Sequence, residues 1–251
     1  MIKFFRNIRR ALIAESKMGK YLQYALGEIL LVMIGILIAL QVNSWNENRL
    51  AQARIDSRLK NLVQDVESDI EEMQDIQERA LRRVTVHKVI LEGAGRTGSI
   101  LRSDSICPIY SREEFSNPNE EISWLKTMDG HRSAYEGLVS SGEFYLIEDQ
   151  KLAIEIQTYY AKVDELQDAE RWNNQETWLI LNHSKHLVGL GTYSTEGTME
   201  KLIELASEDK QFGAVIEHAY ALDLDQHYLT EIIRLQAKEL VASINTYCDK
   251  K

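Results

Sequence analysis

The sequence is poor in residues that interrupt helices and in those that cross-link small folds. Only two of its 251 residues are proline and two are cysteine. Proline ends or kinks helices, so its scarcity favours long helices. Two cysteines exclude a disulfide-rich scaffold. No run of alternating β-branched residues is long enough for a sheet, and we therefore predict an all-α fold, with a helical bundle on a long anchoring helix.

The motifs of common enzyme classes are also missing. The sequence contains no GxSxG elbow, no P-loop and no GxGxxG fingerprint. The string GAGRTGS at 93–99 is glycine-rich, but it lacks the lysine and the flanking strand of a phosphate loop, so we interpret it as a surface loop. Acidic residues outnumber basic ones by 39 to 29, which argues against nucleic-acid binding. We expect no enzymatic activity, cofactor or metal.

Long apolar runs are absent except for one near the N-terminus. The stretch from Ala25 to Val42 contains twelve uninterrupted apolar or glycine residues, Ile29 to Leu40. With its flanks it roughly matches the thickness of a bilayer core. Tyr21 and Tyr24 precede it and Trp45 follows it, as is typical of residues at the headgroup level. The sequence predicts a transmembrane helix at 24–44.

Charge predicts the orientation of this helix. Residues 1–23 carry six basic side chains and one acid, a net charge of +5, whereas residues 44–251 carry about −14. Basic flanks stay in the cytoplasm. We therefore expect a bacterial inner-membrane protein with a cytoplasmic segment at 1–23, which has an amphipathic pattern suited to lying on the lipid surface, and a periplasmic domain at 45–251. A cleaved signal peptide is the alternative, but no small-x-small cleavage site follows Leu40.

Helical periodicity continues through the periplasmic region. Apolar residues recur at steps of three and four from Leu59 to Val84, which predicts a helix over 46–92 that continues from the membrane helix. A loop is expected at 93–112. Asn117, Pro118 and Glu120 form a helix start, and Gly142 a helix end. We expect a short helix at 119–128, a second one ending near 142, a packing seam from 152 to 166, and helices at 169–188, 198–208, 210–222 and 224–247.

The membrane helix carries the candidate contact residues. Gly35 and Ala39 form a small-xxx-small pair, with Gly27 two turns earlier, and small residues let helices approach closely. Ordinary glycine and alanine usage in a membrane helix is the alternative. Glu28 is an ionisable residue one turn inside the apolar run, and either contacts a partner or snorkels to the headgroups. Two further polar residues at the opposite edge are candidates for interhelical hydrogen bonds: Gln41 and Asn43.

Three polar features of the remaining chain have ordinary interpretations. Cys107 and Cys248 are the only cysteines and form a possible disulfide. His183 and His186 lie one turn apart, but without a third ligand a solvated face is the better interpretation. The acid-rich stretch at 65–78 is interpreted as one solvated helix face.

Two blocks resemble a known family. The strings KYLQYALGEILLVMIGILIALQVNSWNE and SAYEGLVSSGEFYLIEDQKLAIEIQTYY look like recurring motifs of a single-pass membrane-protein family of Bacteroidota, the domain of unknown function 6090. The resemblance implies the same topology and a Bacteroidota source. It implies no catalytic residue.

Two functions follow as hypotheses. The first is a membrane-anchored periplasmic module that acts through protein contacts, as a scaffold or accessory subunit. Its partners would be membrane lipid and either a second copy of the chain or another envelope protein. The alternative is a ligand-sensing helical bundle that signals through a partner subunit.

Overall fold

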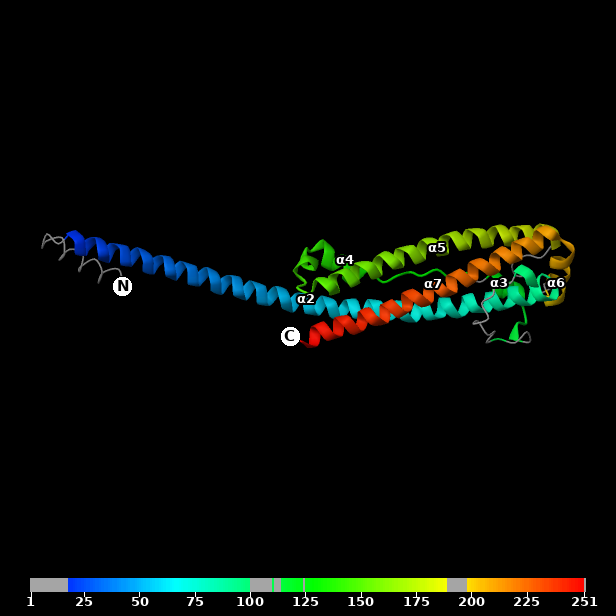
Figure 1. The fold of residues 1–251 in the computed structure, drawn as a ribbon, viewed down its shortest axis with the longest axis horizontal. Coiled ribbons are helices and arrows are strands. Elements are labelled where there is room, and N and C mark those ends of the chain that lie inside the picture. Colours follow the sequence, from blue (N-terminus) through cyan, green and yellow to red (C-terminus); the bar gives the residue numbers. More distant parts are fainter. Residues whose placement is uncertain (1–17, 100–109, 111–113, 124, 189–197, 251) are drawn as a thin grey trace. The chain divides into compact units, whose positions relative to one another are not determined.

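The computed structural model describes the chain apart from residues 1–17, 100–109, 111–113, 124, 189–197 and 251 (Figure 1). The described residues form helices and no strand, which confirms the all-α prediction. The helices are α2 (Met18–Gly93), α3 (Pro118–Ser123), α4 (Ser133–Ser140), α5 (Gln150–Val188), α6 (Met199–Glu208) and α7 (Lys210–Asp249). Two short 3₁₀ turns accompany them, η1 (Thr97–Ser99) and η3 (Glu143–Leu146).

The chain divides into two compact units, Met1–Ile55 and Asp56–Lys251. In the described part of the first unit, the apolar portion of α2 begins near Ala25 and is long and apolar enough to cross a membrane. None of this apolar portion is buried by the rest of the protein. Helix α2 itself runs without a break to Gly93, as its periodicity and lack of proline predict.

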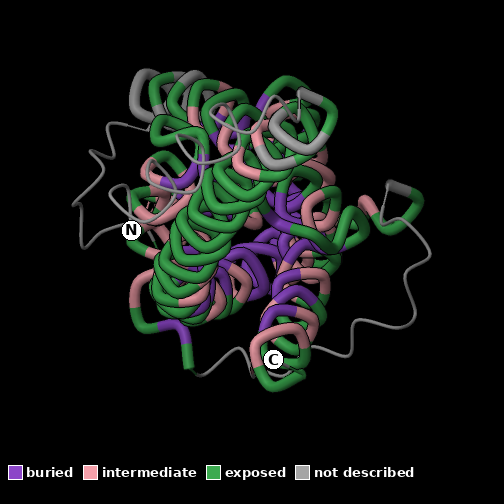
Figure 2. Tube along the Cα trace, turned by 90° about the vertical axis from the view of Figure 1, so that its left-hand side faces the viewer, coloured by how far each residue is buried: buried purple, intermediate pink, exposed green. Residues whose placement is uncertain are grey.

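The second unit is built on three long helices, the part of α2 from Asp56 onward, α5 and α7 (Figure 1). Helix α5 runs in the same direction as α2. Asp69 of α2 bonds to Tyr159 of α5. Fourteen residues further along each helix, Arg83 of α2 and Asn173 of α5 both bond to Asp223 of α7. Helix α7 runs in the opposite direction. Buried residues gather on the sides of the helices that face one another, and exposed residues lie outside (Figure 2). The centre of the unit is therefore a three-helix core.

Helices α5 and α7 are each longer than the sequence predicts. The expected breaks near 167 and 223 do not exist, because α5 and α7 continue through them. The periodicity fades there because polar side chains occupy the core face. Glu170, Asn173, Asp223 and Gln226 are all buried. Both helices begin at an aspartate cap: Asp149 accepts from the N–H of Lys151, and Asp209 from that of Gln211.

A second cluster of apolar residues closes the far end of the unit. It joins the end of α2 to α6 and to the start of α7, with Ile90, Leu202 and Phe212 among its members. Helix α6 begins after a Thr198 cap and ends at Glu208, close to the predicted range of 198–208. A side chain at Gly93 would clash with Ile203 of α6, with the nearest atom 2.7 Å from an added Cβ. Glycine here lets α6 pack on the end of α2.

The segment between α3 and α4 departs from the prediction. A helix was expected over 119–128, but α3 ends at Ser123 and residues 125–132 have no regular structure. Helix α4 ends as predicted before Gly142, which has a left-handed φ of 73°. The backbone groups of residues 125–132 need partners outside a helix, and side chains supply several of them.

Candidate functional site

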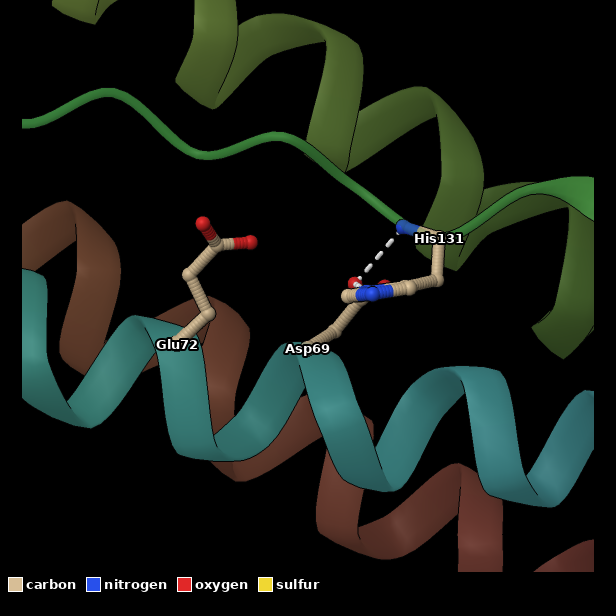
Figure 3. A group of neighbouring side chains, drawn as sticks. All are labelled: Asp69, Glu72 and His131. Carbon is tan, nitrogen blue, oxygen red and sulfur yellow. Dashed lines mark hydrogen bonds and ion pairs between the residues drawn. The ribbon is translucent and has the colours of Figure 1, made fainter.

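Residues 125–132 form an extended strap that lies against α2 and α5 in the second unit. Figure 3 shows the strap passing over α2, with the ring of His131 turned toward Asp69. In the bonds described below, the backbone groups of the strap are bonded to side chains of the two helices. Buried backbone N–H groups that lack a partner are costly, so these side chains determine whether the strap stays in place.

Acids of α2 hold one side of the strap region. Asp65, Asp69 and Glu72 follow one another at steps of four and three, so they share a helix face. Each accepts a backbone N–H, and the donors are Ala134 at 2.9 Å, His131 at 2.8 Å and Asp129 at 3.2 Å. One turn further, Asp75 accepts from Lys126 Nζ at 2.7 Å, and this bond lowers the pKa of Asp75 although burial opposes it. The predicted solvated acidic face is thus wrong for these residues, because they bind the strap.

Asp69 is the central member of the acid ladder, the row formed by Asp65, Asp69 and Glu72 on α2. It is fully buried, and it accepts three hydrogen bonds in total. Its Oδ1 takes the His131 N–H and lies 2.8 Å from His131 Nδ1, while its Oδ2 takes the Tyr159 hydroxyl at 2.7 Å. The bond to Asp69 raises the pKa of His131, and burial raises the pKa of Tyr159. Asp69 therefore connects α2, α5 and the strap at one point.

Helix α5 holds the other side of the strap. Glu170 Oε2 accepts the Met128 N–H at 2.7 Å. Gln167 Nε2 donates to the carbonyl oxygens of Met128 and Asp129 at 3.1 and 3.0 Å. At the end of the strap, Arg132 contacts Asp164 and donates to the Tyr160 carbonyl. The strap is thus fixed from both helices.

Glu170 is unusual because it is fully buried and its two bonded donors are neutral groups. Besides Met128, it accepts from Gln226 Nε2 at 3.4 Å. Burial raises the pKa of Glu170 to about 7, against the opposing effects of the two hydrogen bonds. A carboxyl group with this pKa changes its charge near neutral pH.

A buried polar layer continues from Glu170 across the bundle. Arg83 donates to Asp223 Oδ1 and to Gln226 Oε1, both at 2.8 Å. Asn173 donates to Gln226 at 3.0 Å. Burial raises the pKa of Asp223, but Arg83 and His87 together outweigh it, so its pKa lies below the usual range. His87 Nδ1 lies 3.2 Å from Asp223 Oδ2, but it is not aligned for a hydrogen bond.

Asp69, Glu72 and His131 also have the composition of a metal site. One ligand atom from each lies within 4.8 Å of the others (Figure 3). However, Asp69 Oδ1 already accepts from His131, and Glu72 Oε2 from Asp129. A cation would have to replace these bonds. The geometry therefore favours a clamp on the strap over a metal centre.

The predicted membrane-helix residues all lie in α2. Gly27, Gly35, Ala39 and Gln41 are exposed, and Glu28 is half-buried. An added Cβ at Gly27 or at Gly35 would meet no atom within 4 Å.

Asn43 has a polar contact within its own helix, and its predicted interhelical bond stays a prediction. It donates to Glu47 Oε1 of the same helix at 2.8 Å. Beside Glu28, a shallow hollow is formed by neighbouring side chains of α2.

The possible disulfide and the solvated face expected for the two histidines stay predictions. Cys107 lies outside the described residues, and Cys248 is a half-buried thiol near the end of α7. His183 and His186 belong to α5, but their side chains lie outside the described part.

A groove of about 540 Å³ lies between α5 and α7, near the C-terminal end of α7. Its walls include Ile154, Thr158 and Tyr159 of α5 with Glu239 and Ser243 of α7. Tyr159 thus lines the groove and also reaches Asp69. This connects the groove to the acid ladder.

Sequence reasoning missed the strap, although one signal was present. Between Lys60 and Arg79 the sequence has seven acids and no basic residue. Like charges one turn apart destabilise a helix by a few tenths of a kcal/mol per pair. Such a run is easier to accommodate where donors from elsewhere in the chain reach it, so it is a weak sign of a partner segment.

Comparison of the chain with protein-family models, with curated proteins and with solved structures finds no match.

Proposed function

We propose that the chain is a non-enzymatic module, anchored in the bacterial inner membrane, that acts through protein contacts in the envelope. In this proposal residues 1–23 lie in the cytoplasm and the helical domain in the periplasm. One observation carries it: the apolar portion of α2 is uncovered by the rest of the described chain. Exposed apolar surface of this length needs lipid around it.

The small-residue face supports a protein contact within the membrane. Gly35 and Ala39 lie on one side of α2, and the space beside Gly35 is open. In lipid, helices associate by close packing at small residues, because apolar side chains gain nothing by leaving the hydrocarbon. A second copy of this chain, or the helix of another envelope protein, would pack there.

The exposed apolar residues of α7 support a further contact outside the membrane. Ile232 and Leu235 are each about half exposed, and Tyr228 lies one turn before Ile232 on the same side. Apolar side chains that follow one another along an exposed helix face suit a contact with a partner. These residues give the periplasmic domain a second surface for partners.

Cysteine cross-linking in native membranes tests the membrane contact. Gly35→Cys is made in a background of Cys107→Ser and Cys248→Ser. Met33→Cys and Leu37→Cys are matched controls, because each lies about 200° around the helix from position 35. We expect mild oxidation to trap one dimer, or one fixed partner, at position 35 alone. Equal trapping at all three positions, or none at any, would contradict the proposal.

The orientation has its own test. A membrane-impermeant maleimide should label Cys248 on intact spheroplasts, in a Cys107→Ser background. A cysteine placed by Ser16→Cys should react only after lysis. The reverse pattern would show that the acidic domain is cytoplasmic.

The groove between α5 and α7 favours the second candidate function, ligand sensing through a partner subunit. Its volume suits a small metabolite, and Tyr159 connects its wall to the strap clamp. A thermal-shift screen of the full chain in detergent should then find a stabilising metabolite. Ser243→Trp, which fills the groove, should abolish that shift. If no compound stabilises the wild-type protein, sensing is excluded for the compounds screened and the contact function remains.

A further inference from the structure

The strap depends on side chains that exchange protons. Carboxylates of Asp69, Glu72 and Glu170 accept the N–H groups of three of its eight residues. A strand in a sheet would instead use backbone carbonyls, which do not titrate. We propose that the strap is a proton-controlled latch: it is held between α2 and α5 while Glu170 and His131 carry protons, and is weakened as they lose them. This inference is independent of the membrane function proposed above.

Glu170 supplies the larger part of this dependence. Its carboxyl group is fully buried, and its bonded partners are the N–H of Met128 and the amide of Gln226. Two neutral donors compensate a buried negative charge incompletely. When the strap leaves, the carboxyl group meets water and its charge costs little. Ionised Glu170 therefore favours the open state more than neutral Glu170 does.

The charged neighbours of Glu170 do not remove this penalty. On α2, Glu72 raises the pKa of Glu170 and Arg83 lowers it, but Arg83 also neutralises Asp223 of α7. The other charged residues nearby are paired or more exposed: Lys126 and Asp129 of the strap, and Arg171 of α5, which pairs with Asp168. Burial is the dominant effect, which is why the pKa reaches about 7.

His131 acts in the same direction. Its ring faces three acids of α2, Asp69 at hydrogen-bond distance with Glu72 and Asp65 further away, and all three raise its pKa. The nearby base on its own segment, Arg132, is engaged by Asp164. Protonated His131 gives Asp69 a charge-assisted bond, which is stronger than a neutral one. Loss of that proton weakens the hold of α2 on the strap.

The pH window follows from these directions. Free Glu170 would titrate near 4.5, and the docked group titrates near 7. Docking is therefore strongest below about pH 4.5 and weakens as the pH rises to about 7. His131 extends the weakening above 6.5, its usual pKa. At the acid end, Asp75 loses its bond to Lys126 only below 3.8, because its pKa is lowered.

Hydrogen exchange on the full chain in lipid nanodiscs tests the latch. Protection factors, which already correct for the intrinsic pH dependence of exchange, are measured for the amides of Met128, Asp129 and His131. From the two pKa values of Glu170, protection should fall roughly 30-fold between about pH 5.5 and about pH 8. At each pH these amides should be far less protected than those around Ile233 in the core of α7, which separates local release of the strap from global unfolding.

Two variants complete the test. Glu170→Gln cannot ionise, so most of the pH-dependent fall should disappear. Glu165→Gln, the same change at an exposed carboxyl group of α5, should leave the fall intact. A constant protection factor in the wild type, or the same fall in Glu170→Gln, would overturn the proposal. If Glu170→Gln does not fold, the carboxyl carbon of Glu170 is titrated by NMR in the wild type: a midpoint near 7 supports the latch, and one near 4.5 overturns it.

Discussion

Replacing Asp69 by alanine should destabilise the second unit more than any surface change. The carboxylate is fully buried and serves the backbone and ring of His131 as well as Tyr159. A hydrogen bond to a charged group contributes about 1.5–3 kcal/mol, and donors left buried without a partner cost more than the lost bond. Because the bonds share one acceptor they are not additive, and we expect a loss of about 3–5 kcal/mol in the free energy of unfolding.

Urea unfolding of the full chain in detergent, followed by far-UV circular dichroism, measures this loss. Asp168→Ala is the control, since Asp168 is exposed and pairs with Arg171 one turn along the same helix; it should cost less than about 0.5 kcal/mol. A double-mutant cycle with Tyr159→Phe should give a coupling of about 1.5–3 kcal/mol. If Asp69→Ala unfolds at the same urea concentration as Asp168→Ala, the clamp does not contribute to stability as argued.

Three further predictions concern the bundle. Asp223→Ala leaves the buried Arg83 without its carboxylate, and should cost about 3–5 kcal/mol in urea unfolding, whereas Arg83→Met with Asp223→Leu should recover most of this loss. Gly213→Leu should lower the melting temperature, because an added Cβ would clash with the Arg96 guanidinium and displace its bond to the Ala206 carbonyl. A variant as stable as the wild type would show that Arg96 can move at no cost. The pKa of Glu170 is raised from 4.5 to about 7 in the folded state, so its contribution to stability is fully present below about pH 4.5 and is lost as the pH rises through about 7. Thermal melts at about pH 5 and pH 8 should show most of a difference of about 3 kcal/mol in the free energy of unfolding. Glu170→Gln should remove that difference.

The sequence predicts the helices well where the core face is apolar. From Leu59 to Val84 the three- and four-residue steps mark one continuous helix, and α2 has no break there. The same reasoning divides α5 and α7 wrongly, because Asn173 and Gln226 place amides on the core face. Periodicity measures apolar burial, so a buried polar layer looks like a helix end. An absence of glycine and proline across 150–188 was the better guide to the length of α5.

The acid ladder shows why sequence reasoning stops short of the candidate site. Steps of four and three between Asp65, Asp69 and Glu72 are the steps of any solvated helix face, so their spacing alone identifies no partner. Their partners lie at 129–134, about sixty residues away, at the end of the strap and the start of α4. Within the strap, Asp69 and Glu72 accept the N–H groups of His131 and Asp129, which have no helical partner there. The conformation of the strap and the role of the acids thus depend on each other, and neither can be predicted until α2 and the strap are known to be neighbours. If this coupling is correct, replacing all three acids by their amides should lower the hydrogen-exchange protection of the Asp129 and His131 amides, and unchanged protection would contradict it. The amides keep one acceptor oxygen each but lose the negative charge that strengthens these bonds.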